Sequence, residues 1–233
     1  MAKNLKKTLI LTVVRHGETK ENKERRRQGQ MDTKLNETGI KQAILAGKAF
    51  KNIQFHKIYS SDLQRANKTC QLIVEQNEIL EIKDIIRDPR LRERCFGIFE
   101  NKMDFEYEKK AKEANLENWM DFKPENGESR EEVRERIREF INDMLDQDSK
   151  LENENPSILM VTHGGVIREF FQIIFEELGC ELPKGSQHGD FKKNGSIRNT
   201  CWSRFELVLC DNKIESIKCT ELCNADHLNE LID

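Results

Sequence analysis

Two His-Gly pairs are the residues of this sequence best placed to do chemistry. His16 stands beside Arg15 and follows the apolar run Leu9–Val14, and His163 follows a second apolar run, Ile158–Val161. A single histidine after a strand is most often a structural residue. Two histidines in matching positions, one of them beside an arginine, favour a functional site, because imidazole can serve as nucleophile, acid or base near neutral pH.

The two apolar runs indicate how these histidines are positioned. Both runs are short and continuously apolar, and the first is rich in β-branched residues, as is typical of parallel strands covered on both faces. In open α/β sheets, ligands bind beyond the carboxyl ends of such strands. We therefore expect both His-Gly pairs to face one crevice.

Strands and helices alternate along most of the chain. This alternation predicts an α/β fold with three layers, α/β/α, in which helices cover both faces of a mostly parallel central sheet. The expected strands are Leu9–Val14, Lys57–Ser60, a segment near Ile82–Ile86, Ile158–Val161, and a terminal hairpin of Cys201–Cys210 with Lys213–Thr220 across Asp211 and Asn212. One expected helix opens at Asn36, and another follows a cap at Ser61 or Asp62. Further helices are expected over Met103–Trp119, Ser129–Leu145 and Val166–Leu178, whereas Arg87–Asn101 is expected to be a loop.

Length and composition narrow the class of protein. The chain has 233 residues, which fits one α/β domain over residues 1–233, and a formal net charge of −3 gives no reason to expect a nucleic-acid partner. No apolar run approaches the length of a membrane span, and seven cysteines without a disulfide framework indicate reduced thiols. We therefore expect a soluble, cytoplasmic protein, and its oligomeric state stays open.

Five short motifs, spread over almost the whole chain, resemble those of the histidine phosphatase superfamily, which includes the cofactor-dependent phosphoglycerate mutases. The motifs are Arg15–Thr19 with Asn22, Ser60–Ala66, Leu91–Glu100, Gly127–Ser129 and Val161–Gly164. An Arg-His-Gly triplet alone is weak evidence, whereas five motifs in the family's order are specific. The resemblance implies a phosphoglycerate mutase-like fold and phosphoryl transfer through a phosphohistidine.

The resemblance also implies a role for each catalytic residue. Arg15 and Arg65 would bind the phosphoryl oxygens, and His16 would take the phosphoryl group while a backbone carbonyl holds its other ring nitrogen. Glu93 would protonate the leaving oxygen and then activate water, and His163 would act as a further donor. No metal or cofactor is expected, because arginines and histidines supply the positive charge. Substrate contacts are expected from Asn22, Gln28, Gly29, Glu128, Gly164 and Thr200.

Three departures from the mutases favour a net phosphatase. Thr19 stands where mutases typically have serine, Glu21 stands where they have tryptophan, and their longer insertion after the acid loop is missing. Among phosphatases the chain looks most like the TIGAR-type fructose-2,6-bisphosphatases, whose sequences match Leu11–Thr19, Gln28–Gln30, Arg90–Arg94 and Asp226–Asn229. Phe96 and Asn101 replace a tyrosine and a glycine common in that group.

We therefore expect a metal-independent phosphatase of small phosphorylated metabolites, with a role in glycolysis regulation and with the 2-phosphate of fructose 2,6-bisphosphate as the first candidate for cleavage. A bisphosphate needs a second anion site, for which the candidates are Arg25, Arg26, Arg27, Arg90, Lys102 and Arg198. A phosphoglycerate mutase, a broad-specificity phosphomonoesterase and a phosphate-binding protein without turnover remain as alternatives.

Each of these residues also has a structural interpretation. Taken alone, Arg65 is most simply a solvated charge on a helix. Glu93 is equally well explained as a counter-charge to the arginines around it, so only the joint pattern favours catalysis. Cys219, Cys223 and His227 are spaced four apart, as metal ligands on a helix would be. Because this segment is expected to be a strand rather than a helix, we do not expect these three residues to form a metal site.

Overall fold

Strand β1 (Lys6–Arg15) lies inside the sheet, and its central residues are buried. The computed structural model of the chain describes residues 6–80, 84–149, 151, 153, 155–183, 197–211 and 213–231. β1 pairs in parallel with β4 (Ser157–Thr162) and antiparallel with β5 (Trp202–Cys210). The register with β4 sets Arg15 opposite Thr162, so that His16 and His163 leave the sheet at the same edge.

The sheet of the described residues has six strands in the order β3-β2-β4-β1-β5-β6. The remaining strands are β2 (Lys57–Ser60), β3 (Ile86–Arg87) and β6 (Lys213–Asn224). The pairs β3-β2, β2-β4 and β4-β1 are parallel, and only the two pairs that involve β5 are antiparallel. This confirms the predicted mostly parallel sheet and the terminal hairpin. Asn212, predicted for the turn of that hairpin, lies outside the described residues.

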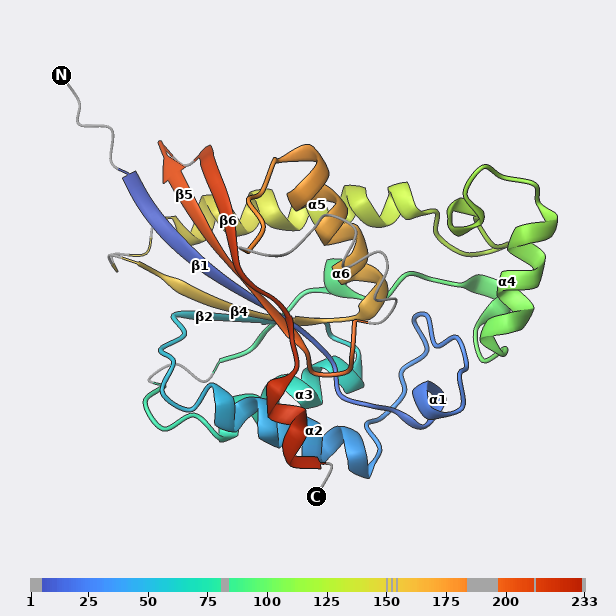
Figure 1. Ribbon diagram of the computed structural model, residues 1–233, viewed down its shortest axis with the longest axis horizontal. Coiled ribbons are helices and arrows are strands. Elements are labelled where there is room, and N and C mark those ends of the chain that lie inside the picture. The colour runs from blue at the N-terminus through green and yellow to red at the C-terminus, as the bar shows by residue number, and fades with distance from the viewer. Residues whose placement is uncertain are drawn as a thin grey trace.

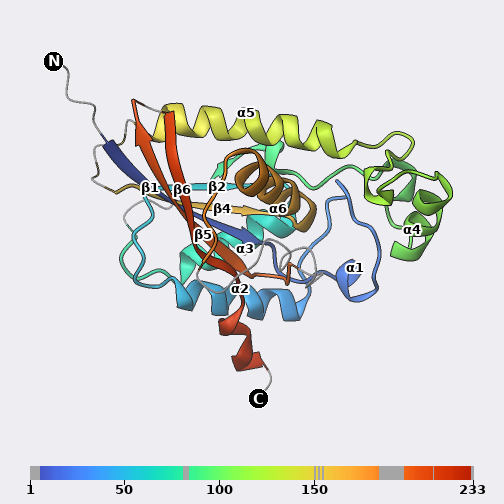
Figure 2. The ribbon, with the colours of Figure 1, turned by 45° about the horizontal axis from the view of Figure 1, so that its top comes forward.

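Helices cover both faces of the sheet (Figures 1 and 2). Helices α2 (Glu37–Ala49) and α3 (Gln64–Glu75) lie on one face, and α5 (Arg130–Asp148) and α6 (Gly164–Phe171) lie on the other. The short α1 (Lys20–Lys23) and α4 (Asp104–Glu113) lie to one side of these layers (Figure 1). The predicted three-layer α/β/α architecture is confirmed.

Two hydrophobic clusters fill the spaces between the layers. Alternate residues of a strand point to opposite faces, so Leu11 and Val13 of β1 belong to the cluster under α5 and α6, which includes Phe140. Val14 belongs to the cluster over α2 and α3, which includes Phe50. A strand that is apolar on both faces is therefore the sequence signal of this central position. No helix among the described residues is long and apolar enough to cross a bilayer.

Several helix boundaries differ from the prediction. Helix α4 ends at Glu113 rather than Trp119, because Asn115 takes a left-handed conformation (φ 49°), and Trp119–Asp121 forms a separate 3₁₀ turn. Helix α6 begins at Gly164 and continues into a π-helical segment, Gln172–Glu177. Helix α5 begins after Ser129 as predicted, where the Ser129 hydroxyl accepts from the Glu132 amide in a capping box, but it ends at Asp148 rather than Leu145.

The start of α3 also differs from the prediction. Its N-cap residue is Leu63, and neither Ser61 nor Asp62 occupies that position. Instead, the Asp32 carboxylate, from a distant loop, accepts from the Gln64 amide at 2.7 Å, and the Ser61 hydroxyl accepts from the Leu63 amide. This tertiary cap ties the loop around Asp32 to the helix turn that carries Arg65.

The segment after α3 is mainly irregular, as predicted for its second half. Strand β3 is limited to Ile86–Arg87, and Ile82 lies outside the described residues. The stretch Arg87–Asn101 contains two 3₁₀ turns, Pro89–Leu91 and Gly97–Phe99, and otherwise forms a loop. Asn101 has a φ of 64°, a left-handed conformation that asparagine tolerates.

Candidate active site

A cavity of about 780 Å³ opens where β1 and β4 end. Eight arginines and four acidic residues line it, so its walls carry an excess of positive charge. Such a charge balance suits an anionic ligand. The predicted site residues along its wall are Arg15, His16, Asn22, Gln28, Gly29, Arg65, Glu93 and Gly164.

One ring nitrogen of His16 is held by the backbone. Nδ1 lies 2.7 Å from the Gly17 carbonyl oxygen, which can only accept, so Nδ1 carries the proton and the lone pair lies on Nε2. The His16 amide donates to the Thr162 carbonyl and the Gly17 amide donates to the Thr69 hydroxyl. These contacts fix the ring, which is only 2 % exposed.

Burial keeps both histidines neutral. Desolvation, and after it the positive charges of Arg65 and Arg15, lowers the pKa of His16 well below its usual range. Desolvation and the charge of Arg65 do the same to the pKa of His163. A neutral imidazole has the lone pair that a nucleophile needs.

Two arginines lie close to His16 with unused donors. Arg65 is fully buried and donates from Nη1 to the Met31 carbonyl and from Nη2 to the Gly29 carbonyl, each at 2.7 Å, and Arg15 donates to the Ile197 carbonyl. Burial lowers the pKa of Arg65 to about 10, so the group remains charged near neutral pH. The Nε atoms of both arginines are buried without a partner among the described residues, so each keeps a donor that a phosphoryl oxygen could accept from.

Gly29 is the residue whose backbone makes this arrangement possible. Its φ is 53°, in the left-handed region, and a Cβ there would lie 2.0 Å from Oε1 of Glu100. Oε1 of Glu100 in turn accepts from the Gln30 amide at 2.9 Å. Glycine is therefore required at the point where the loop presents its carbonyl to Arg65.

Glu93 reaches the same cavity from the loop after β3. Its Oε1 accepts from the Arg94 amide at 2.8 Å and its Oε2 accepts from the Gly165 amide at 2.9 Å. A Cβ on Gly165 would lie 2.2 Å from Oε1 of Glu93, so the second glycine after His163 makes room for the carboxylate.

His163 lies behind His16 rather than on the cavity wall. It is completely buried, its Nε2 lies 2.9 Å from the Ser61 hydroxyl, and its ring centroid is 5.1 Å from that of His16. Its Nδ1 has no partner among the described residues. The structure thus brings the two predicted histidines together, as the strand register requires.

Three further predicted contacts line the cavity. Asn22 closes a capping box with Thr19, and its Oδ1 also lies 3.3 Å from Nδ2 of Asn199. Gln28 accepts from the Thr33 hydroxyl at 2.6 Å, which leaves its amide nitrogen available as a donor. Gly164 packs against Arg15, and a Cβ there would lie 3.3 Å from the guanidinium Nε.

Glu128 and Thr200, predicted to contact substrate, occupy supporting positions instead. Neither residue lines the cavity. The Glu128 carboxylate is bound by Arg136, and the buried Thr200 hydroxyl lies 2.8 Å from Nε2 of His227. The Thr200 amide donates to the carbonyls of Arg15 and His16, so this residue supports the turn behind the nucleophile.

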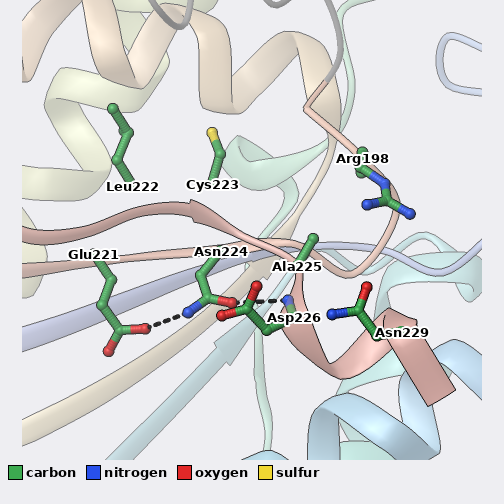
Figure 3. Close-up of a pocket in the computed structure, with 8 residues that line it drawn as sticks. All are labelled: Arg198, Glu221, Leu222, Cys223, Asn224, Ala225, Asp226 and Asn229. Carbon is green, nitrogen blue, oxygen red and sulfur yellow. Dashed lines mark hydrogen bonds between the residues drawn. The ribbon is translucent and has the colours of Figure 1, made fainter. Parts of the chain in front are cut away.

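The six basic residues predicted for a second anion site separate into two groups. Arg25, Arg26 and Arg27 line the cavity, although Arg26 is paired with Glu24 and Arg27 with Asp104. The other three basic residues do not line the cavity. Arg90 pairs with Asp88 and Asp143, and Lys102 lies away from the cavity wall. Arg198 lines a separate pocket of about 470 Å³ beside β6 (Figure 3).

Three cavity arginines were missed by sequence reasoning: Arg94, Arg130 and Arg168. Arg168 lies on α6, four and three residues after the glycines that face the cavity, so helical spacing was the available signal. Desolvation lowers the pKa of Arg168, and among the described residues it has no ion-pair partner within salt-bridge distance. Arg130 lies at the start of α5, where Glu169 binds it at 2.6 Å.

The Cys219, Cys223 and His227 spacing does not correspond to a helix face. The two cysteines lie on β6, and His227 lies in the 3₁₀ turn Asp226–Leu231, where its ring packs on Trp202 with centroids 4.7 Å apart. Among the described residues, no group of three metal-ligating side chains was found.

Comparison with known proteins shows the family of the chain. Residues 11–218 match the model of the histidine phosphatase superfamily, branch 1, and the chain therefore belongs to this superfamily. It is 34 % identical to fructose-2,6-bisphosphatase TIGAR B of Danio rerio over 257 aligned positions, which cover 96 % of this chain and 98 % of the relative.

Solved structures agree with the fold. A mycobacterial glucosyl-3-phosphoglycerate phosphatase is 26 % identical, with a TM-score of 0.68 over 87 % of this chain and 98 % of its own. Phosphoglycerate mutase from Bacillus anthracis is 22 % identical, with a TM-score of 0.74 over 97 % and 98 %. The comparisons confirm the predicted family, the phosphoglycerate mutase-like fold and the prediction of a phosphatase.

We expect both His16 and His163 to stay neutral between about pH 6 and about pH 8, since burial and the neighbouring guanidinium groups disfavour imidazolium. Nitrogen-correlated NMR of the imidazole rings across this range measures their protonation, with His16→Gln and His163→Gln variants to assign the signals. Titration of either ring near its unperturbed pKa of about 6.5 would contradict the proposed electrostatics.

Proposed function

We propose that this protein is a metal-independent phosphatase that hydrolyses small sugar bisphosphates through a phosphohistidine at His16. The observation that carries the proposal is the neutral His16, with Nδ1 held by a carbonyl and with unpaired Nε donors of Arg15 and Arg65 beside it. These groups can bind a phosphoryl group and attack it without any rearrangement of the site.

The proposed first step transfers the phosphoryl group to the enzyme. Nε2 of His16 forms a bond to phosphorus while the bond between phosphorus and the substrate oxygen breaks, and protonated Glu93 donates its proton to the leaving oxygen. In the second step Glu93 takes a proton from water, whose oxygen attacks phosphorus and releases His16. Inorganic phosphate leaves, and Glu93 is protonated again.

The charge that spreads over the phosphoryl oxygens is stabilised by groups that are already oriented. Arg15 and Arg65 remain charged while buried, and their carbonyl contacts hold the guanidinium planes in place. In the proposed complex, Asn22 of α1 and Gln28 of the loop that follows α1 contribute donors. His163 would donate from its Nδ1, which has no partner among the described residues.

Two cavity arginines are candidates for a second anion site, which a bisphosphate substrate would need. The cavity is larger than one phosphate requires, and Arg168 and Arg25 line it without an ion pair to any described residue. The 34 % sequence identity to a fructose-2,6-bisphosphatase over almost the whole chain makes fructose 2,6-bisphosphate the first candidate substrate. Hydrolysis of this bisphosphate would give the enzyme a role in the regulation of glycolysis.

We also propose a cytoplasmic location, which is supported by the seven cysteines, all of them free thiols.

The alternative functions are separated from the proposed one by product analysis. A phosphoglycerate mutase would return an isomeric phosphate ester, a broad phosphomonoesterase would not discriminate bisphosphates from monophosphates, and a binding protein would release no phosphate.

The substrate prediction is tested by Arg168→Met, assayed on fructose 2,6-bisphosphate and on sugar monophosphates in excess EDTA. We expect KM for the bisphosphate to rise about tenfold or more, since a charge-assisted contact is lost, while kcat changes little because the contact is equal in ground and transition states. Arg198→Met, which removes an arginine from the separate pocket, is the control. Equal effects on both substrate classes, or loss of activity in EDTA, would contradict the proposal.

The role of Glu93 is tested by Glu93→Gln, which keeps the shape of the side chain but removes its proton transfer. We expect kcat on alkyl phosphates to fall by about 10²–10⁴-fold, and much less on nitrophenyl phosphate, whose leaving group needs no proton. Equal losses on the two substrates would assign Glu93 a structural role only.

A further inference from the structure

We propose that Arg136 and Glu128 are positioning residues for Glu93: their ion pair sets the backbone of the loop that delivers this carboxylate to the phosphoryl group. The inference rests on the acid-base role proposed for Glu93. Neither Arg136 nor Glu128 lines the cavity, so any effect on catalysis must act through another residue.

Arg136, on α5, binds Glu128 and also binds the main chain of the Glu93 loop at Arg90 and at Glu93. Its Nε donates to Oε1 of Glu128 at 3.0 Å and its Nη2 to Oε2 at 3.1 Å, the two-pronged geometry of a strong guanidinium-carboxylate pair. The remaining donors reach the main chain: Nη1 binds the Arg90 carbonyl, and Nη2 lies 3.3 Å from the Glu93 carbonyl.

Glu128 holds the loop from the other side. Its Oε2 accepts from the Cys95 amide at 2.8 Å, and its own amide donates to the Cys95 carbonyl at 3.0 Å. The Glu128 carbonyl accepts from Nε of Arg94 at 2.8 Å, and Arg94 also binds the Phe122 carbonyl. The three residues from Glu93 to Cys95 are therefore each bound by Arg136 or Glu128.

The carboxylate of Glu93 depends on this backbone for its position. The hydrogen bonds that it receives from described residues come from two amides, of Arg94 and Gly165, and the first belongs to the same loop. A shift of the loop therefore moves the carboxylate and one of its two donors together. Catalytic groups lose efficiency when they are displaced by about 1 Å.

The pair itself is shielded from solvent. The side chains of Arg136 and Glu128 are 14 % and 22 % exposed. By contrast, Arg138, two residues further along the same helix, pairs with Glu131 and Glu177, and its hydrogen bonds to described residues do not include the loop. Arg138 is thus a matched control for the loss of an arginine and its ion pair from α5.

The experiment compares kcat on an alkyl phosphate and on nitrophenyl phosphate for full-length Arg136→Met, Arg136→Lys, Glu128→Gln and Arg138→Met. We expect Arg136→Met and Glu128→Gln to lose about tenfold or more on the alkyl phosphate and to stay within about twofold on the aryl phosphate, as partial copies of Glu93→Gln. Arg136→Lys should recover part of the loss, and Arg138→Met should change neither rate.

A double variant separates positioning from general damage. Adding Arg136→Met to Glu93→Gln should cost nothing further on the alkyl phosphate, because residues that act as one unit are not additive. Equal losses on both substrates, or an additive double variant, would overturn the proposal. If Arg136→Met does not fold, the nearly isosteric Glu128→Gln decides. Failure of Glu93→Gln to separate the substrates would instead overturn the proposed function.

Discussion

The burial of two guanidinium groups beside one neutral imidazole is the constraint on which the rest of this structure depends. Moving a charged group out of water costs several kcal/mol even after the protein relaxes. The carbonyls of Gly29, Met31 and Ile197 offset part of this cost for Arg65 and Arg15. The Nε atoms of both arginines have no partner among the described residues, so this offset is incomplete, and a bound phosphoryl group would complete it.

The surrounding elements can be understood as supports for these three groups. The register of β1 and β4 places His16 next to His163, and the carbonyl after His16 selects its tautomer. Asp32 caps α3 from the loop that also presents carbonyls to Arg65. Glycine at position 165 leaves space for the Glu93 carboxylate, whose loop is held from α5. The chemistry proposed here therefore depends on geometry that is set before substrate binds.

The sequence predicted the parts of this arrangement that depend on local pattern. The apolar runs before His16 and His163 identified the central strands, and their shared edge brought the two histidines together. Contacts between distant segments were not predictable in this way. Glu128 was expected at the substrate but binds Arg136, and the cap of α3 comes from Asp32, because in each case the partner is chosen by tertiary packing. Arg168 was missed although its helical spacing from Gly164 carried a usable signal.

The central claim is that the phosphoryl group passes through His16. The most direct measurement is rapid-quench trapping with labelled substrate, followed by peptide mapping of acid-labile, base-stable phosphate on the protein. The structure predicts label on His16 during turnover and none on a folded His16→Ala variant, which should also be inactive because no other group replaces the nucleophile. Label on another residue, or undiminished turnover by His16→Ala, would contradict the account.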